Sequence, residues 1–159
     1  MCGIVGYVGS QESLPILLEG LRRLEYRGYD SAGVAILNGQ GLLVKKSAGK
    51  IAILEKLLGA SMPGGTLGIA HTRWATHGEP TTVNAHPHTD CKGNIAIVHN
   101  GIIENYVTLK KKLEQEGHRF TTETDTEVIV HLIEKYFTGN LERAVAAAVQ
   151  HLTGTYGIA

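Results

Sequence analysis

The 159-residue chain is predicted to form one α+β domain with antiparallel strands. Short apolar runs end at glycines, and two segments that contain Asn-Gly separate such runs, which is typical of β-hairpins. Other segments repeat apolar residues every three to four positions, which is typical of amphipathic helices. Because strands join through hairpins and helices come in clusters, the pattern favours α+β over alternating strand and helix.

The first half of the chain contains four predicted strands and two predicted helices. The helix after the first strand has leucines at positions 14, 17, 18, 21 and 24, which share one face, and Gly28 can end it. Asn38-Gly39-Gln40-Gly41 predicts a hairpin between two strands. In chain order, the expected elements are a strand over 4–8, the leucine-rich helix, strands over 32–37 and 42–46, a helix over 51–58 and a strand over 66–72.

The second half begins with a long segment, residues 74–91, that has no periodic pattern. An irregular stretch of this length in a small domain indicates function or disorder. A second hairpin is predicted at Asn100-Gly101, between apolar runs at 94–98 and 102–103. The remaining expected elements are a helix over 106–115, a helix opened by residues 124–127, a helix over 141–152 with Asn140 as its cap, and a strand from Thr155.

Composition excludes several classes of protein. Lys and Arg number 15 and Asp and Glu number 15, so the chain is neutral and has no charge pattern for nucleic acid or an anionic membrane. Two cysteines without a CxxC pair indicate neither a disulfide framework nor a typical zinc motif. No apolar run reaches membrane-spanning length and the N-terminus lacks signal-peptide features, so we expect a cytoplasmic protein without membrane partners.

Cys2 is a candidate catalytic nucleophile because of its position. Removal of Met1 would leave its thiol one residue from a free α-amine, and that amine can exchange a proton near neutral pH. Threonine paired with its own terminal amine is an established form of this chemistry. The alternative is that Cys2 is a small apolar residue at the start of a buried strand.

Candidate binding groups follow in two segments. Arg73 offers a planar guanidinium that fits a carboxylate, with Thr76 and His77 as further donors; alternatively, it is a surface arginine. Asn100-Gly101 is either a plain hairpin turn or a pair of donors for the oxyanion of an acyl-transfer intermediate. Asp125 is either a helix N-cap or a partner for an ammonium group.

The loop histidines raise a metal hypothesis, because five lie between positions 71 and 99 with Asp90 and Cys91 nearby. Their spacing matches no common zinc motif, so we expect no metal at these residues. A metal-dependent hydrolase remains an alternative function. The five are His71, His77, His86, His88 and His99.

Six motifs, which together span the chain, resemble the glutaminase domain of the glucosamine-6-phosphate synthase family, a branch of the class II N-terminal-nucleophile glutamine amidotransferases. They are Cys2-Gly3-Ile4-Val5-Gly6, residues 26–33 (YRGYDSAG), 71–80 (HTRWATHGEP), 84–88 (NAHPH), 99–105 (HNGIIEN) and 123–127 (ETDTE). The resemblance implies a four-layered αββα sandwich of two antiparallel sheets. It also implies hydrolysis of the glutamine side-chain amide, whose ammonia the full-length enzyme transfers to fructose 6-phosphate.

The resemblance also implies roles for individual residues. Cys2 would attack glutamine, Asn100 and Gly101 would form the oxyanion hole, and Asp125 with the Gly101 carbonyl would bind the α-ammonium. Arg73, Thr76 and His77 would bind the α-carboxylate, Trp74 would gate the ammonia path, and Arg27 would orient the Cys2 end. No cofactor is implied.

Family enzymes continue into isomerase domains and form homo-oligomers, so residues 1–159 are expected to be an incomplete glutaminase domain. The alternatives are another class II amidotransferase, or a truncated fragment that binds glutamine without turnover.

Overall fold

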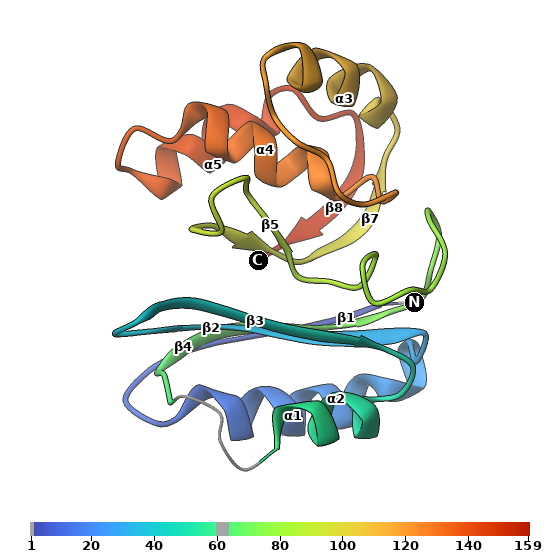
Figure 1. Cartoon of the computed structure of the whole chain (residues 1–159), viewed down its shortest axis with the longest axis vertical. Helices are drawn as coiled ribbons and strands as arrows, with labels where there is room; N and C mark the ends of the chain where they lie inside the picture. The colour runs from blue at the N-terminus through green and yellow to red at the C-terminus, as the bar shows by residue number, and fades with distance from the viewer. Residues whose placement is uncertain (1, 60–63) are drawn as a thin grey trace.

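Two antiparallel layers of strands lie face to face between two layers of helices (Figure 1). The computed structural model describes residues 2–59 and 64–159. Helices α1 and α2 cover the outer face of the first sheet, and α3, α4 and α5 lie beyond the second layer of strands. This arrangement confirms the predicted α+β class and the four-layered sandwich.

The first half of the chain forms the larger sheet and its helices. The sheet is antiparallel in the order β1-β4-β2-β3. The predicted hairpin is confirmed, because Asn38 pairs with Gly41 at the β2–β3 turn. Leu17 and Leu21 are fully buried against this sheet, as the leucine periodicity predicts. The elements are β1 (Gly3–Val8), α1 (Ser13–Leu24), a 3-10 turn (Glu25–Arg27), β2 (Ser31–Asn38), β3 (Gly41–Ala48), α2 (Ile51–Leu58) and β4 (Leu67–Arg73).

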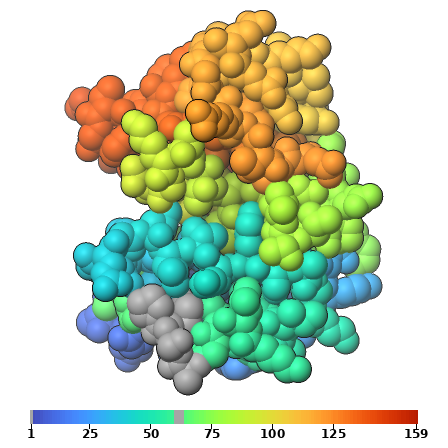
Figure 2. All heavy atoms as spheres, viewed as in Figure 1, coloured from blue at the N-terminus to red at the C-terminus, as the bar shows by residue number. Residues whose placement is uncertain are grey.

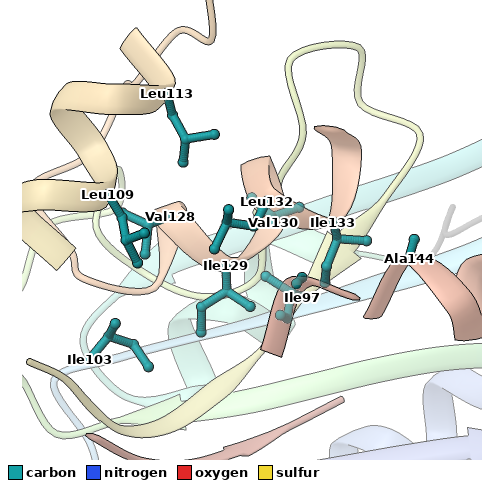
Figure 3. Close-up of a cluster of buried hydrophobic side chains, with 11 residues drawn as sticks. Ile97, Ile103, Leu109, Leu113, Val128, Ile129, Val130, Leu132, Ile133 and Ala144 are labelled. Carbon is teal, nitrogen blue, oxygen red and sulfur yellow. The ribbon is translucent and has the colours of Figure 1, made fainter. Parts of the chain in front are cut away.

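The second half forms two short ribbons and three helices. The ribbons are β5 (His88–Thr89) with β6 (Ala96–Ile97), and β7 (His99–Ile103) with β8 (Gly154–Ile158). The helices are α3 (Tyr106–Gln115), α4 (Glu127–Tyr136) and α5 (Leu141–Val149). Figure 3 shows the apolar side chains that join these helices to the strands; α4 supplies five of them, including Ile129 and Ile133. Asn140 caps α5 as predicted, since its side chain accepts the N–H of Arg143 at 2.9 Å.

The hairpin predicted at Asn100-Gly101 is wrong. Both residues lie inside β7, where Asn100 pairs with Gly157 and Gly101 with Tyr156. Gly101 has a φ of +131°, and a Cβ there would lie 1.9 Å from the Thr155 carbonyl oxygen. Glycine therefore allows close strand pairing here, and a tertiary contact overrides the local turn signal.

The N-cap role considered for Asp125 is also wrong. The cap position of α4 is Thr126, and the Asp125 carboxylate instead accepts the backbone N–H of Ile103 at 2.8 Å. This bond ties the segment before α4 to β7. Asp125 also lines the cavity described below.

Each half of the chain also forms its own side of the molecular surface. Figure 2 shows the first half on one side, in blue to green, and the second half on the other, in yellow to red. Within the described residues, no helix has both the length and the apolar character needed to cross a membrane.

Candidate active site

A cavity of about 460 Å³ lies where the two halves meet. Its lining includes every predicted site residue except His77, drawn from segments far apart in the sequence. These lining residues are Cys2, Arg27, Arg73, Trp74, Thr76, Asn100, Gly101 and Asp125. The volume is in the range of small-molecule sites.

Cys2 directly precedes β1 and lies beside the end of β4. Pairing of Gly3 with Thr72 brings it beside Trp74, 72 positions away. The backbone N–H of Trp74 donates to Cys2 Sγ at 3.2 Å, and Sγ lies 3.5 Å from the Trp74 carbonyl oxygen. The expected removal of Met1 concerns a residue outside the described range.

Asn100 connects Cys2 to the interior of the molecule. Its side-chain Nδ2 donates to the Cys2 carbonyl oxygen at 3.3 Å, and its Oδ1 lies 2.9 Å from His71 Nε2. The amide is therefore held at both ends, with its N–H group on the Cys2 side.

The register of β7 and β8 sets the direction of the Gly101 backbone. Val98 and Ala159 exchange both of their backbone hydrogen bonds, and such pairs alternate along an antiparallel ladder. Gly101 and Ile103 therefore occupy positions whose N–H groups are directed away from β8. The N–H of Ile103 fits this pattern because it reaches Asp125, so the Gly101 N–H faces the same side.

Arg73 and Asp125 place opposite charges on the cavity. Only 3% of Arg73 and 4% of Asp125 is exposed. The Arg73 guanidinium donates to the carbonyl oxygens of Glu79 at 3.1 Å, Gly78 at 3.2 Å and His77. Burial lowers the Arg73 pKa, while the nearby Cys2, Asp30 and Asp125 oppose that shift. Arg73 thus holds the 77–79 segment in place as well as lining the cavity.

The remaining predicted residues belong to the loop and to the turn after α1. Trp74 is 46% exposed and packs edge-on against Tyr29, with ring centroids 5.7 Å apart. The His77 ring lies against Tyr106 instead, at 5.4 Å, and is not among the lining residues. Thr76 and Arg27 line the cavity.

Buried histidines and threonines without a role expected from the sequence also belong to this region: His86, His99, Thr124 and Thr126 line the cavity, and His88 contacts Thr124. His86 Nε2 and His99 Nδ1 lie 2.9 Å and 2.8 Å from the Thr126 hydroxyl, and His88 Nε2 lies 3.1 Å from Thr124 Oγ1. The sequence could have indicated these residues, because Thr124 and Thr126 flank Asp125 and His99 directly precedes Asn100.

Burial decides the charge of these histidines. It lowers the pKa of His71 to about 4 and that of His88 to about 3, and it lowers the His86 pKa well below its ordinary value. They are therefore neutral near pH 7. Their ring nitrogens form hydrogen bonds with Asn100 and with the hydroxyls of Thr124 and Thr126.

Residues 71–159 match the model of the glutamine amidotransferase domain. The chain belongs to this family. Curated relatives named glutamine–fructose-6-phosphate aminotransferase (isomerising) are 57% identical over the whole chain in Symbiobacterium thermophilum and 58% identical in Aquifex aeolicus. The chain spans 26% and 27% of the length of these relatives. The expected glutamine amidotransferase family is thereby confirmed.

A solved structure of a glutamine amidotransferase has the same fold. The glutamine phosphoribosylpyrophosphate amidotransferase of B. subtilis, in complex with ADP and GMP, is 30% identical to this chain with a TM-score of 0.85. The match covers 99% of this amidotransferase domain and 34% of that chain.

Proposed function

We propose that this amidotransferase domain hydrolyses the side-chain amide of L-glutamine to glutamate and ammonia. The observation that carries the proposal is one cavity lined by a nucleophilic Cys2 and by the oppositely charged Arg73 and Asp125. A free α-amino acid carries one carboxylate and one ammonium group, so these two side chains match its two charges. Arg73 and Asp125 lie far apart in the sequence, so only folding brings their side chains to the same cavity.

The reaction requires a free α-amine on Cys2, exposed by removal of Met1. The amine accepts the thiol proton while Sγ bonds to the amide carbon of glutamine. The tetrahedral intermediate then collapses, the C–N bond breaks, and the amine returns the proton so that nitrogen leaves as ammonia. Water next attacks the thioester, which releases glutamate and restores the thiol.

The proposed donors for the negative oxygen of that intermediate are Asn100 Nδ2 and the Gly101 N–H. Asn100 Nδ2 already points to the Cys2 end of the cavity, at 3.3 Å from the Cys2 carbonyl oxygen. The Gly101 N–H is directed away from β8, toward the side where the Ile103 N–H reaches Asp125. Preorganised donors of this kind stabilise an acyl-transfer transition state by about 3 kcal/mol each.

Binding of the amino-acid end falls to residues around the same cavity. The Arg73 guanidinium, with Thr76 and the backbone of His77, binds the α-carboxylate. Asp125, with the carbonyl of Gly101, binds the α-ammonium. Trp74 closes the ammonia side, and Arg27 supports the Cys2 end. No cofactor or metal takes part in this step.

The longer protein to which this domain would belong is a glutamine–fructose-6-phosphate aminotransferase. An isomerase region outside this chain would accept the ammonia and form glucosamine 6-phosphate, within a cytoplasmic homo-oligomer. The support for this branch of the family is the 57% identity to a relative of that name.

The deciding experiment measures glutamate formed from L-glutamine by the purified chain and by Cys2→Ala. We expect Cys2→Ala to lose at least about 10³-fold in rate. Val8→Ala, an exposed change at the other end of β1, serves as the matched control and should keep the parent rate. Equal rates for the parent and Cys2→Ala would refute the mechanism.

The alternative function, a fragment that binds glutamine without turnover, predicts different results. An intact mass that retains Met1 would favour it, because the amine would then be locked in a peptide bond. Tight glutamine binding with no glutamate release would agree with that result.

A further inference from the structure

Four side chains of metal-ligand type meet outside the cavity. Cys91 lies in the turn after β5, His118 lies just after α3, and His131 and Glu134 lie one turn apart on α4. One ligand atom from each lies within 4.8 Å of the others. None of the four lines the candidate active site, and the loop histidines considered from the sequence take no part.

The distances within this cluster are close to those of a tetrahedral zinc site. Cys91 Sγ lies 3.7 Å from His131 Nδ1 and 4.0 Å from His118 Nδ1. Glu134 Oε2 lies 2.9 Å from His118 Nδ1 and 3.2 Å from His131 Nδ1. Zinc bonds of about 2.3 Å to sulfur and about 2.0–2.1 Å to nitrogen or oxygen give edges of roughly 3.6 Å and 3.4 Å in a tetrahedron.

The chemistry of the four ligands also favours zinc. A thiolate selects a soft or borderline ion, and imidazole suits zinc, copper, iron and nickel. A carboxylate completes a four-ligand set with two negative charges, which neutralises a divalent ion. Such closed four-residue sites are structural, because no position is left for a reacting water.

Neighbouring groups support the ligands as they do in zinc proteins. The backbone N–H of Arg119 donates to Cys91 Sγ at 3.3 Å. On the other side of its ring, His131 Nε2 faces the Glu127 carboxylate at 3.7 Å, and Thr122 Oγ1 holds that carboxylate at 2.7 Å. A carboxylate behind a histidine ligand orients the ring and raises its basicity. The cluster also has access to solvent, since Cys91 is exposed.

We propose that Cys91, His118, His131 and Glu134 bind one Zn²⁺ ion as a structural site. The ion would tie the β5–β6 turn and the segment after α3 to α4. Because α4 directly follows Asp125 and Thr126, the site would stabilise the helix that supports one wall of the cavity. The proposal does not depend on the proposed glutaminase activity.

A competing explanation is a metal-free hydrogen-bonded cluster centred on Glu134. Its Oε2 is within hydrogen-bond distance of both Nδ1 atoms, and the backbone N–H of Cys91 donates to it at 3.3 Å. In that case the sulfur would contribute nothing to cation binding. The two explanations differ in what Cys91 does, and that difference sets the test.

The test uses the full chain with Cys2→Ala, so that the terminal thiol cannot bind the probe. After treatment with a chelator, the protein is titrated with Co²⁺ and then Zn²⁺. We expect one ion per chain, with a thiolate-to-cobalt charge-transfer band that Zn²⁺ abolishes. Cys91→Ser should remove that band and weaken zinc binding about 100-fold or more, and His118→Gln should weaken it at least about 10-fold.

His151→Gln is the matched control, because His151 is an exposed histidine outside the cluster. It should bind zinc like the parent. Zinc should raise the urea midpoint of the parent and of His151→Gln but not that of Cys91→Ser. Circular dichroism checks that the variants fold, and both substituted ligands lie near the surface. Absence of one-to-one binding, or unchanged binding in both ligand variants, would overturn the proposal.

Discussion

His71 Nε2 lies 2.9 Å from Oδ1 of Asn100, a residue that lines the candidate active site. An amide oxygen only accepts hydrogen bonds, so Nε2 carries the proton and His71 donates. The bond directs the other end of the amide, Nδ2, toward Cys2. His71 is therefore a positioning residue, which acts on the reaction through Asn100.

This relationship predicts a specific effect of substitution. His71→Leu should lower kcat for glutamine hydrolysis by about 10- to 100-fold with a smaller change in KM, because the amide loses its fixed orientation. His71→Gln, which can still donate from its side-chain nitrogen, should recover part of kcat. Steady-state kinetics check this. A similar loss in both variants, or a rise in KM alone, would contradict the positioning role.

Acid should destabilise the domain below pH 6.5. The folded-state pKa of His71 is about 4 and that of His88 about 3, because both are buried, against 6.5 when unfolded. Between these values the unfolded chain binds more protons, so the free energy of unfolding falls as the pH falls. The expected slope is up to about 1.4 kcal/mol per pH unit for each histidine.

Urea unfolding between pH 4.5 and 7.5 measures that slope. His88→Gln keeps a group that can form a hydrogen bond with Thr124. It should reduce the slope by the contribution of about one proton, because one buried histidine is removed. His151→Gln removes an exposed histidine and should leave the slope close to that of the parent. A flat profile, or the same slope in His88→Gln as in the parent, would show that buried neutral histidines do not govern it.

Arg73 should affect substrate binding more than turnover. Arg73→Lys cannot donate to three carbonyl oxygens in a fork, so both the carboxylate site and the 77–79 segment lose their anchor. We expect KM for glutamine to rise at least about 10-fold, with faster hydrogen exchange at residues 77–80. Arg143→Lys, at an exposed position on α5, is the control. An unchanged KM with a collapsed kcat would disagree with this role.

Gly101 should tolerate no side chain. In Gly101→Ala the new methyl group would meet the Thr155 carbonyl oxygen at 1.9 Å, at a φ of +131°. We expect the free energy of unfolding to drop by about 2–4 kcal/mol and glutamine hydrolysis to be lost, because β7 must shift. Gly6→Ala is the matched control, since nothing lies within 4 Å of a Cβ there. Equal stabilities of the two variants by urea unfolding would rule out this strand-pairing explanation.

Elements with a strong local signal could be predicted from the sequence. The leucine periodicity of α1, the Asn38–Gly41 turn and the Asn140 cap each depend on residues within a few positions of one another. Cys2 could also be named as a candidate nucleophile, because that hypothesis follows from its place next to Met1. The sequence identified Arg73, Asn100 and Asp125 as candidate residues, but it did not show that they line one cavity.

Predictions failed where a distant partner competes with the local signal. Asn100-Gly101 has the composition of a turn, yet β8, more than 50 positions later, pairs with it as a strand. Asp125 has the composition of a helix cap, yet the Ile103 N–H takes its carboxylate. In both cases the tertiary structure supplies a partner for a backbone group that the local sequence does not show.

The sequence by itself determined most of the element types, the candidate role of Cys2 and the family resemblance, because each depends on local order along the chain. Only the tertiary structure decided which way the Gly101 N–H faces, which histidines are neutral, and that Cys91 meets His118, His131 and Glu134. These properties depend on packing between segments 16 to 43 positions apart or more. Burial and strand register, which arise only when segments far apart in the sequence pack together, set them.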